Sequence, residues 1–210
     1  GGALRRGAAV GGRMSRAGTP LFPLRTVLFP EGPLPLRVFE PRYLDMVSRC
    51  LREEGSFGVL LLLGGAAAGA ARTASIGTLA RITDWYQGSD GILGVTAVGT
   101  ERFALESVSQ QPDGLYVGEI TPLGPEPRAP LPPADQPMAE LLAAILADLG
   151  KLYDTLPRRL DDAGWVGCRL AEILPMPLEQ KQHCLQLDDA LERLDFVRPM
   201  LRSVRWETTQ

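Results

Sequence analysis

Hydrophobic and polar residues alternate with a period of two along much of the first half of the chain. Between residues 19 and 124 the alternating runs are separated by Gly, Asp and Ser. They read LFPLRTVLF, PLPLRVF, FGVLLLL, IGTLARITDWYQ, ILGVTAVGTERFALESV and LYVGEI. Alternation of this kind is typical of half-buried β-strands. We therefore predict a β-rich subdomain over residues 19–124.

The opening stretch, residues 20–47, holds six prolines among large apolar residues. Proline lacks a backbone N–H and has a fixed φ, so this stretch can form neither a central strand nor an uninterrupted helix. It predicts two short strand pieces, a turn and a helix that begins at Pro41 and ends at Gly55. Residues at spacings of three and four should form the apolar face of this helix: Tyr43, Leu44, Val47, Cys50 and Leu51.

The pattern changes after TPLGPEPRAPLPPADQP, residues 121–137, which holds seven prolines. Such a composition indicates an extended connector, which we place at residues 125–136. Beyond it, apolar residues recur at helical spacing from Leu141 to Leu156, and again in WVGCRLAEIL and LEQKQHCLQL. We predict a helical subdomain over residues 137–210 that packs against the first half, with Pro199 kinking or shortening its last helix.

Composition adds that the fold needs no metal or cofactor. The chain has 210 residues, of which 45% are hydrophobic, enough to bury a core. Its three cysteines, Cys50, Cys168 and Cys184, are far apart and form no C-x-x-C motif. Neither a disulfide framework nor a zinc site is indicated, and a cytoplasmic location fits best. The longest apolar stretch is interrupted by glycines, so no membrane segment is expected.

Charge is distributed unevenly along the chain. The net charge is −3, yet Arg5, Arg6, Arg13 and Arg16 have no acidic neighbour within residues 1–18, which leaves 18 basic against 25 acidic residues in the remainder. An acidic body disfavours nucleic-acid binding. We interpret residues 1–18 as an unfolded tail, because they lack the apolar core of a secretory signal.

Candidate catalytic motifs are weak throughout. The sequence GGAAAG at residues 64–69 has Ala66 where a dinucleotide-binding loop requires glycine, so it predicts a surface loop. His183 and Cys184 are adjacent and would point about 100° apart on a helix, which disfavours a thiol–imidazole pair. Neither lysine, Lys151 or Lys181, lies in a motif that places it beside a serine nucleophile, and no phosphate-binding loop is present.

Two pairs of aspartates precede predicted helices. Asp161 and Asp162, like Asp188 and Asp189, could hold a cation, but carboxylates at these positions interact favourably with helix N-termini. We expect helix capping here and no metal site. No catalytic residue is predicted.

Charged and aromatic residues gather in and near the opening stretch. We expect Arg25, Arg37, Glu40 and Arg42 to form a structural charge network, although they could instead face a ligand. Six aromatic residues are candidates for a peptide-binding surface, with most of them in the core and one or two exposed beside an edge strand. They are Phe22, Phe29, Phe39, Tyr43, Trp85 and Tyr86.

Four segments occur in an order that resembles the Lon substrate-binding domain, the N-terminal domain of Lon proteases that is also found alone in bacteria. They are FPLRTVLFPEGPLPLRVFEPRY, IGTLARI, GVTAVGTERFAL and RLAEILPMPLEQKQHCLQLDDALERL. The resemblance covers residues 20–200. It implies an α+β fold, with a PUA-like pseudobarrel followed by a helical subdomain, and a stand-alone bacterial member without the Lon ATPase or peptidase domains.

The resemblance also implies a function, namely binding of unfolded or degradation-bound polypeptides in protein quality control, without catalysis. Three alternatives remain open. The chain could be a protein–protein scaffold or homo-oligomerisation module, an unrecognised hydrolase, or, by analogy with other PUA-like proteins, an RNA-binding protein. The acidic body opposes the last of these.

Overall fold

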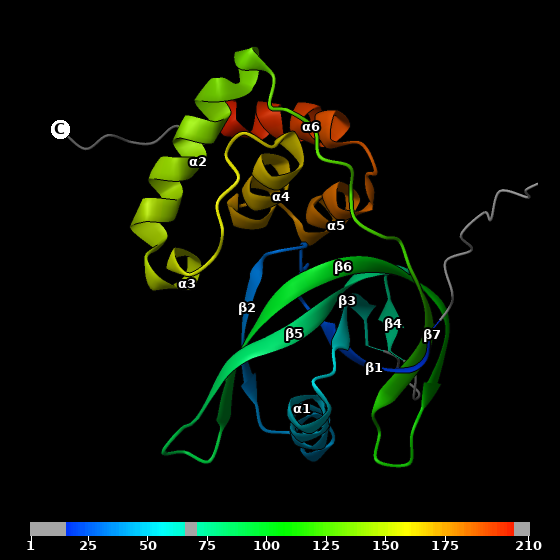
Figure 1. The fold of residues 1–210 in the computed structure, drawn as a ribbon. Helices are drawn as coiled ribbons and strands as arrows, with labels where there is room; N and C mark the ends of the chain where they lie inside the picture. Colours follow the sequence, from blue (N-terminus) through cyan, green and yellow to red (C-terminus); the bar gives the residue numbers. More distant parts are fainter. Residues whose placement is uncertain (1–15, 66–70, 204–210) are drawn as a thin grey trace, which may run out of the picture.

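Five strands of the first half close into a barrel-like sheet (Figure 1). We describe residues 16–65 and 71–203 of the computed structural model. The strands follow the order β1 (Arg16–Leu24), β7 (Tyr116–Pro122), β6 (Leu93–Gln110), β5 (Ile76–Gln87) and β3 (Phe57–Gly64). These neighbours are antiparallel, and a parallel pairing of β1 with β3 completes the circuit. The alternating runs of the sequence therefore predicted the strands correctly.

Two further strands lie outside this circuit. The short β4 (Arg72–Thr73) pairs with β3, and β2 (Pro33–Val38) pairs with β6. Among the described strands β2 has β6 as its single partner, so its second edge is unpaired. Pro33 and Pro35 lack N–H groups and are tolerated on such an edge, where they also limit the addition of a further strand.

The helix α1 (Pro41–Glu53) covers the end of the barrel opposite the other helices (Figure 1). Pro41 occupies its first turn, as predicted, and its buried residues are Tyr43, Met46, Val47 and Cys50. Leu51 was expected on this face but is exposed. The left-handed residue that ends the helix is Glu54, with φ of 51°, and not Gly55.

The second half is helical, as predicted. It contains η1 (Pro133–Asp135), α2 (Gln136–Leu149), α3 (Lys151–Asp154), α4 (Ala163–Ile173), α5 (Leu178–Gln186) and α6 (Ala190–Ser203). The helical spacing of apolar residues extends to Leu156, yet α2 ends at Leu149, and the next residue, Gly150, has a φ of 65°. The last helix continues past Pro199 to Ser203, so the proline does not shorten it there. Pro199 lies inside the helix, where it lacks the N–H that would bond to the carbonyl of Asp195.

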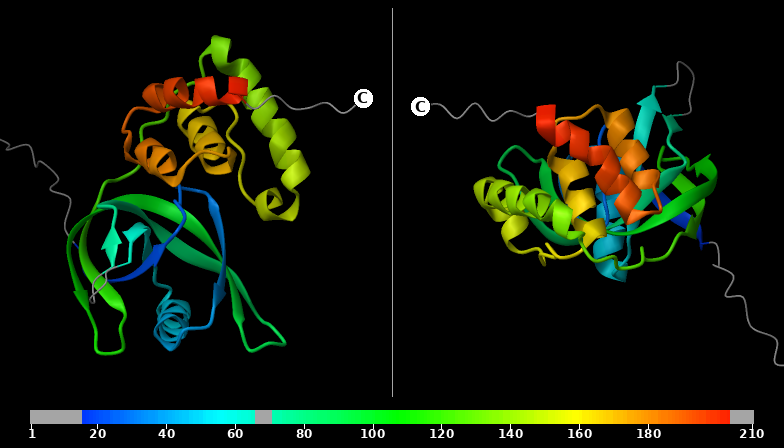
Figure 2. Two further views of the ribbon diagram at one scale, coloured as in Figure 1. Left: turned by 180° about the vertical axis from the view of Figure 1, so that it is seen from behind. Right: turned by 90° about the horizontal axis from the view of Figure 1, so that it is seen from above.

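The helices pack over one end of the barrel, as the view from above shows (Figure 2). Their hydrophobic core includes Val27, Phe29, Leu61 and Ala74 from the first half. The side chain of Gln182 in α5 donates a hydrogen bond to the carbonyl of Ile76 at 3.0 Å. Residues 123–132 run without helix or strand between β7 and η1. The division into separate domains at residues 125–136 stays a prediction.

Two sequence-based expectations concern segments that are only partly described. Residues 1–15 of the expected tail lie outside the described residues, and residues 16–18 belong to β1. Of the glycine-rich loop at residues 64–69, positions 66–69 lie outside the described residues.

Candidate polypeptide-binding surface

The proline-rich opening stretch lines a groove of about 420 Å³. Most of the lining comes from residues 22–25 at the end of β1 and from residues 37–40 at the end of β2. The first turn of α1 contributes as well, and Leu62, Ala71 and Tyr116 complete the lining. The prolines fix the backbone of both strand ends, so the groove lies between segments of restricted flexibility.

Stacked side chains form one wall of this groove. The rings of Phe22 and Tyr43 are parallel within 4°, with centroids 3.9 Å apart. The guanidinium of Arg42 lies 4.7 Å from the centroid of the Tyr43 ring. Burial raises the pKa of Tyr43, and the nearby Arg42 offsets part of this rise. The wall is apolar, and the ion pair of Arg42 with Glu40 lies beside it.

The four charged residues of the opening stretch do not form one network. Arg42 donates to Glu40 at 3.0 Å and to the carbonyl of Gly114 at 2.8 Å. Arg37 pairs instead with Asp90 in the β5–β6 hairpin, at 3.0 Å. Arg25 is exposed, and no ion pair joins it to a carboxylate of the described residues. Arg42 and Glu40 thus hold the groove wall, whereas Arg25 and Arg37 are open to solvent.

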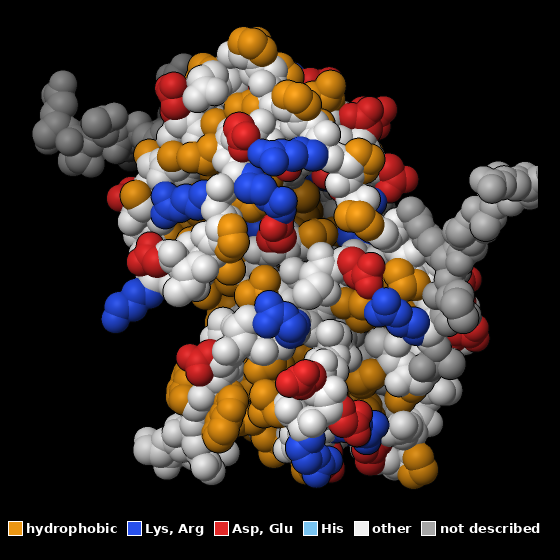
Figure 3. Space-filling model, in the orientation of Figure 1, with side chains coloured by type: hydrophobic (Ala, Val, Ile, Leu, Met, Phe, Trp, Pro, Cys, Tyr) orange, Lys and Arg blue, Asp and Glu red, His pale blue; other side chains and the backbone are white. Residues whose placement is uncertain are grey.

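The six candidate aromatic residues divide into buried and exposed groups. Phe22 and Tyr43 are buried except where they line the groove, and Phe29 is fully buried beneath the helices, away from any surface. The exposed fractions of the other three are 64% for Phe39, 53% for Trp85 and 65% for Tyr86. We call these three exposed residues the aromatic rim. Figure 3 shows hydrophobic side chains gathered along the β5–β6 hairpin, at the lower left of the view.

The strand register connects the hairpin to the groove. Gly94 of β6 lies between Arg37 of β2 and Tyr86 of β5 in one row across the sheet. The Tyr86 ring covers Gly94, because a Cβ at that position would lie 2.2 Å from the ring. Tyr86 therefore shares a face of the sheet with Arg37. Trp85, its neighbour along the strand, points to the opposite face.

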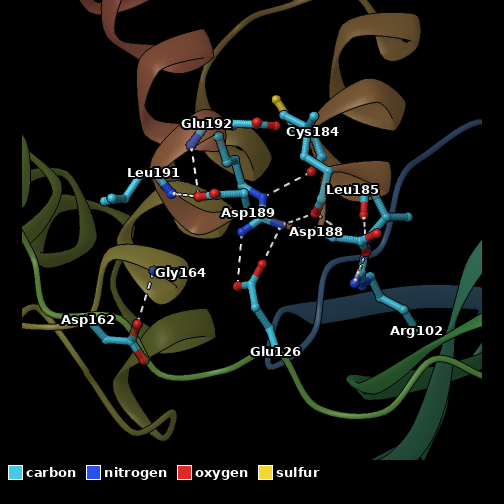
Figure 4. Close-up of polar contacts among 12 residues, drawn as sticks. Arg102, Glu126, Asp162, Gly164, Cys184, Leu185, Asp188, Asp189, Leu191 and Glu192 are labelled. Carbon is cyan, nitrogen blue, oxygen red and sulfur yellow. Dashed lines mark hydrogen bonds and ion pairs between the residues drawn. The ribbon is translucent and has the colours of Figure 1, made fainter.

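Sequence reasoning missed a buried cluster of arginines between the connector and the helices (Figure 4). Arg193 is 1% exposed and donates to both carboxylate oxygens of Glu126, at 3.0 and 2.8 Å. It also donates to the carbonyls of Cys184 and Leu187. Its position in the buried stripe of α6, beside Leu194 and Val197, was the signal that could have revealed it.

Arg102 of β6 provides a second contact of this kind. Its guanidinium donates to the carbonyl of Leu185 at 2.8 Å and to Asp188 at 2.8 Å. Arg102 thus holds the loop between α5 and α6 against the barrel (Figure 4), whereas Arg193 joins this loop to Glu126 of the connector. A cavity of about 190 Å³ lies beside Glu126, but each of the two arginines already has a carboxylate partner. We therefore interpret the cluster as structural, because its contacts stabilise the packing of the connector and of the loop between α5 and α6.

The residues that could suggest catalysis are dispersed. His183 is exposed and contacts the ring of Phe196, whereas Cys184 is fully buried. Burial lowers the pKa of Lys181, whose amino group donates to the backbone carbonyl of Glu172 at 2.5 Å. No cluster of three potential metal ligands occurs within residues 16–65 and 71–203.

The aspartate pairs act at helix ends. Asp162 accepts a hydrogen bond from the N–H of Gly164 at the start of α4. Asp189 accepts from the N–H groups of Leu191 and Glu192 at the start of α6. These two aspartates cap their helices, as the sequence predicted.

None of the helices in the described part of the chain has the length and apolar character needed to cross a bilayer.

Comparisons with known proteins identify the fold. The chain is similar to the structure described as "Crystal Structure of Lon N-terminal domain protein from Xanthomonas campestris", with 39% identity and a TM-score of 0.72. The match covers 89% of this chain and 98% of that one. The N-terminal domain of the Mycobacterium avium complex Lon protease shares the fold at 17% identity, with a TM-score of 0.63 and coverage of 91% and 100%. Comparison with curated proteins gives no match.

The class of protein is therefore that of Lon N-terminal domains, with an antiparallel barrel-like sheet and a C-terminal helical part. The family model of the ATP-dependent protease La (LON) substrate-binding domain matches residues 18–203. The chain belongs to this family, which confirms the resemblance seen in the sequence. Membership supports a role as a substrate-recognition module.

Proposed function

We propose that the protein is a non-catalytic module that binds unfolded or degradation-bound polypeptides. The aromatic rim beside the groove is the observation that carries the proposal. Exposed aromatic side chains next to a concave apolar surface favour contacts with nonnative segments, whose own apolar residues are exposed. A flexible polypeptide loses entropy on binding, so each contact should be weak, and release should be easy.

The absence of covalent chemistry is part of the same proposal. In the described residues, His183 is exposed, Cys184 is buried, the Lys181 amino group donates to the carbonyl of Glu172, and none of the three lines the groove. A reaction would require a nucleophile, a base and an oxyanion site that converge in one pocket. We therefore expect a bound client to stay intact.

Substitution of the rim tests this proposal. Phe39→Ala and Tyr86→Ala should each weaken binding by about 1–2 kcal/mol, or roughly 5- to 30-fold in Kd, as is common for interface anchors. Binding is measured by fluorescence anisotropy with a reduced, carboxymethylated protein as the unfolded client. Gel electrophoresis of the same mixtures shows whether the client is cleaved. Thermal melts should be little changed, because both rings are largely outside the core.

Val108→Ala is a matched control, because Val108 is also exposed but lies at the far end of β6, paired with Gly118. Trp85→Ala tests the other face of the β5–β6 hairpin, because Trp85 and Tyr86 point to opposite faces of the sheet. If the rim variants and the control bind the client equally well, the rim is not the binding surface. A second copy of the chain could also cover the rim, and sedimentation velocity would reveal this alternative as a dimer that the rim variants dissociate.

A further inference from the structure

The residues that line the groove carry a net positive charge. Three arginines and one glutamate line it, whereas the chain as a whole has a net charge of −3. The lining therefore favours a negatively charged partner, although the net charge of the protein is negative. The charge of the lining therefore suggests a substrate preference in addition to that for apolar segments.

The three arginines differ in how strongly they are already engaged. Arg42 is held by Glu40, by the carbonyl of Gly114 and by the ring of Tyr43, so it belongs to the wall. Arg37 has one partner, Asp90, and both side chains of this pair are more than half exposed. Solvent-exposed ion pairs contribute little and exchange readily.

Arg25 is the least engaged of the three. It is exposed at the rim of the groove, and no carboxylate of the described residues lies within ion-pair distance of it. Arg25 and Arg37 can therefore reach a ligand without breaking the stack that forms the wall. Guanidinium groups bind carboxylates in a bidentate geometry that neutral donors do not provide.

The apolar wall and the two available arginines lie in the same groove. Phe22 and Tyr43 form the wall, and the exposed ring of Phe39 stands at the edge. We propose that the groove selects polypeptide segments in which an acidic residue lies close to a large apolar side chain. The apolar side chain packs on the exposed ring of Phe39 beside the wall, and the carboxylate pairs with Arg25 or Arg37. This inference rests on the proposed function and specifies its substrate class.

Matched peptides test the selection directly. Three fluorescein-labelled peptides of about 12 residues share the same apolar residues and differ at two positions, which carry Glu, Gln or Lys. The Glu peptide should bind about 5-fold tighter than the Gln peptide at low ionic strength, and the Lys peptide should bind most weakly. The difference between the Glu and Gln peptides should shrink in about 0.5 M salt, because exposed charges are then screened.

The protein variants locate the preference. Arg25→Gln with Arg37→Gln should bind the Glu and Gln peptides equally while keeping the wild-type affinity for the Gln peptide. The control combines Arg128→Gln with Arg158→Gln, which removes one exposed charge from the connector and one from the helical half and should keep the preference. Thermal melts of both double variants check folding.

The outcomes separate the two proposals. If wild-type protein binds the Glu and Gln peptides equally, the charge selection is wrong and the polypeptide-binding function stands. If none of the peptides and no unfolded client binds, the function itself is wrong. If the Arg128→Gln, Arg158→Gln control also loses the preference for the Glu peptide, the preference depends on the net charge of the protein. That result would overturn the assignment to the groove. Equal binding of a single-stranded oligonucleotide of matched charge would also overturn it, by showing an unspecific cationic site.

Discussion

Replacement of Arg193 by methionine should destabilise the protein severely without altering its surface. Methionine keeps much of the apolar stem, which packs against Gly167, but removes the guanidinium. Four hydrogen bonds are lost, two to Glu126 and one each to the carbonyls of Cys184 and Leu187. Glu126 is then left without its partner in a site where its side chain is 21% exposed.

The magnitude follows from this geometry. Removal of one partner of a buried ion pair typically costs 3–5 kcal/mol. Glu126 retains some access to water, so we expect a value near the lower end, about 3 kcal/mol. For a protein of this size that loss corresponds to a decrease in Tm of roughly 6–12 °C. Replacing Glu126 by methionine as well should recover part of the loss, because no buried carboxylate then remains unpaired.

Urea unfolding followed by circular dichroism gives the free energy of unfolding of each variant. Arg128→Met is the control, because its pair with Asp161 is exposed on both sides and should be worth about 0.5 kcal/mol or less. If the free energy of unfolding of Arg193→Met lies within about 0.5 kcal/mol of the wild-type value at an unchanged m-value, the stabilising role of Arg193 is refuted.

Two further predictions concern titratable groups. Burial raises the pKa of all three thiols, that of Cys184 to about 11, so DTNB at pH 8 should label none of them in the folded protein and all of them in urea. Burial also raises the pKa of Glu172 above its ordinary 4.5, so the folded state binds this proton more tightly than the unfolded state. The contribution of Glu172 to the free energy of unfolding is therefore full at low pH and falls as pH rises above about 4.5, until its folded pKa is passed. Urea titrations between pH 4 and 7 should show the stability of Glu172→Gln improving relative to wild type with rising pH, and a constant difference would contradict this.

The strands and helices could be predicted because their signals are local. Alternation and punctuation by Gly and Pro lie within each run, and they located all the long strands. The backbone conformations of individual residues were harder to predict from the sequence. Glu54 takes the left-handed conformation that is usual for glycine, and Gly150 interrupts a continuous apolar pattern. At Gly150 a second local signal ends the helix, because glycine adopts a positive φ readily and is common at helix ends.

The candidate surface was predictable only in part. Sequence identified the aromatic residues, but their exposure depends on where the β5–β6 hairpin extends beyond the barrel. Alternation assigns Trp85 and Tyr86 to opposite faces, yet it cannot show that both faces meet solvent there. The partners of charged residues were hidden for a similar reason, since Arg193 and Glu126 are 67 residues apart in the chain.

The parallel pairing of β1 with β3 has a consequence for how the protein matures. The segment between these strands contains β2 and α1, which supply much of the groove lining, and Tyr116 adds to it from β7. The groove therefore exists only after β1 has paired with partners as distant as β7, whose register places Leu21 opposite Tyr116. Contacts of such long sequence separation form slowly. A nascent chain that ends before β7 has no complete groove, so the proposed client binding should begin only after the barrel has closed.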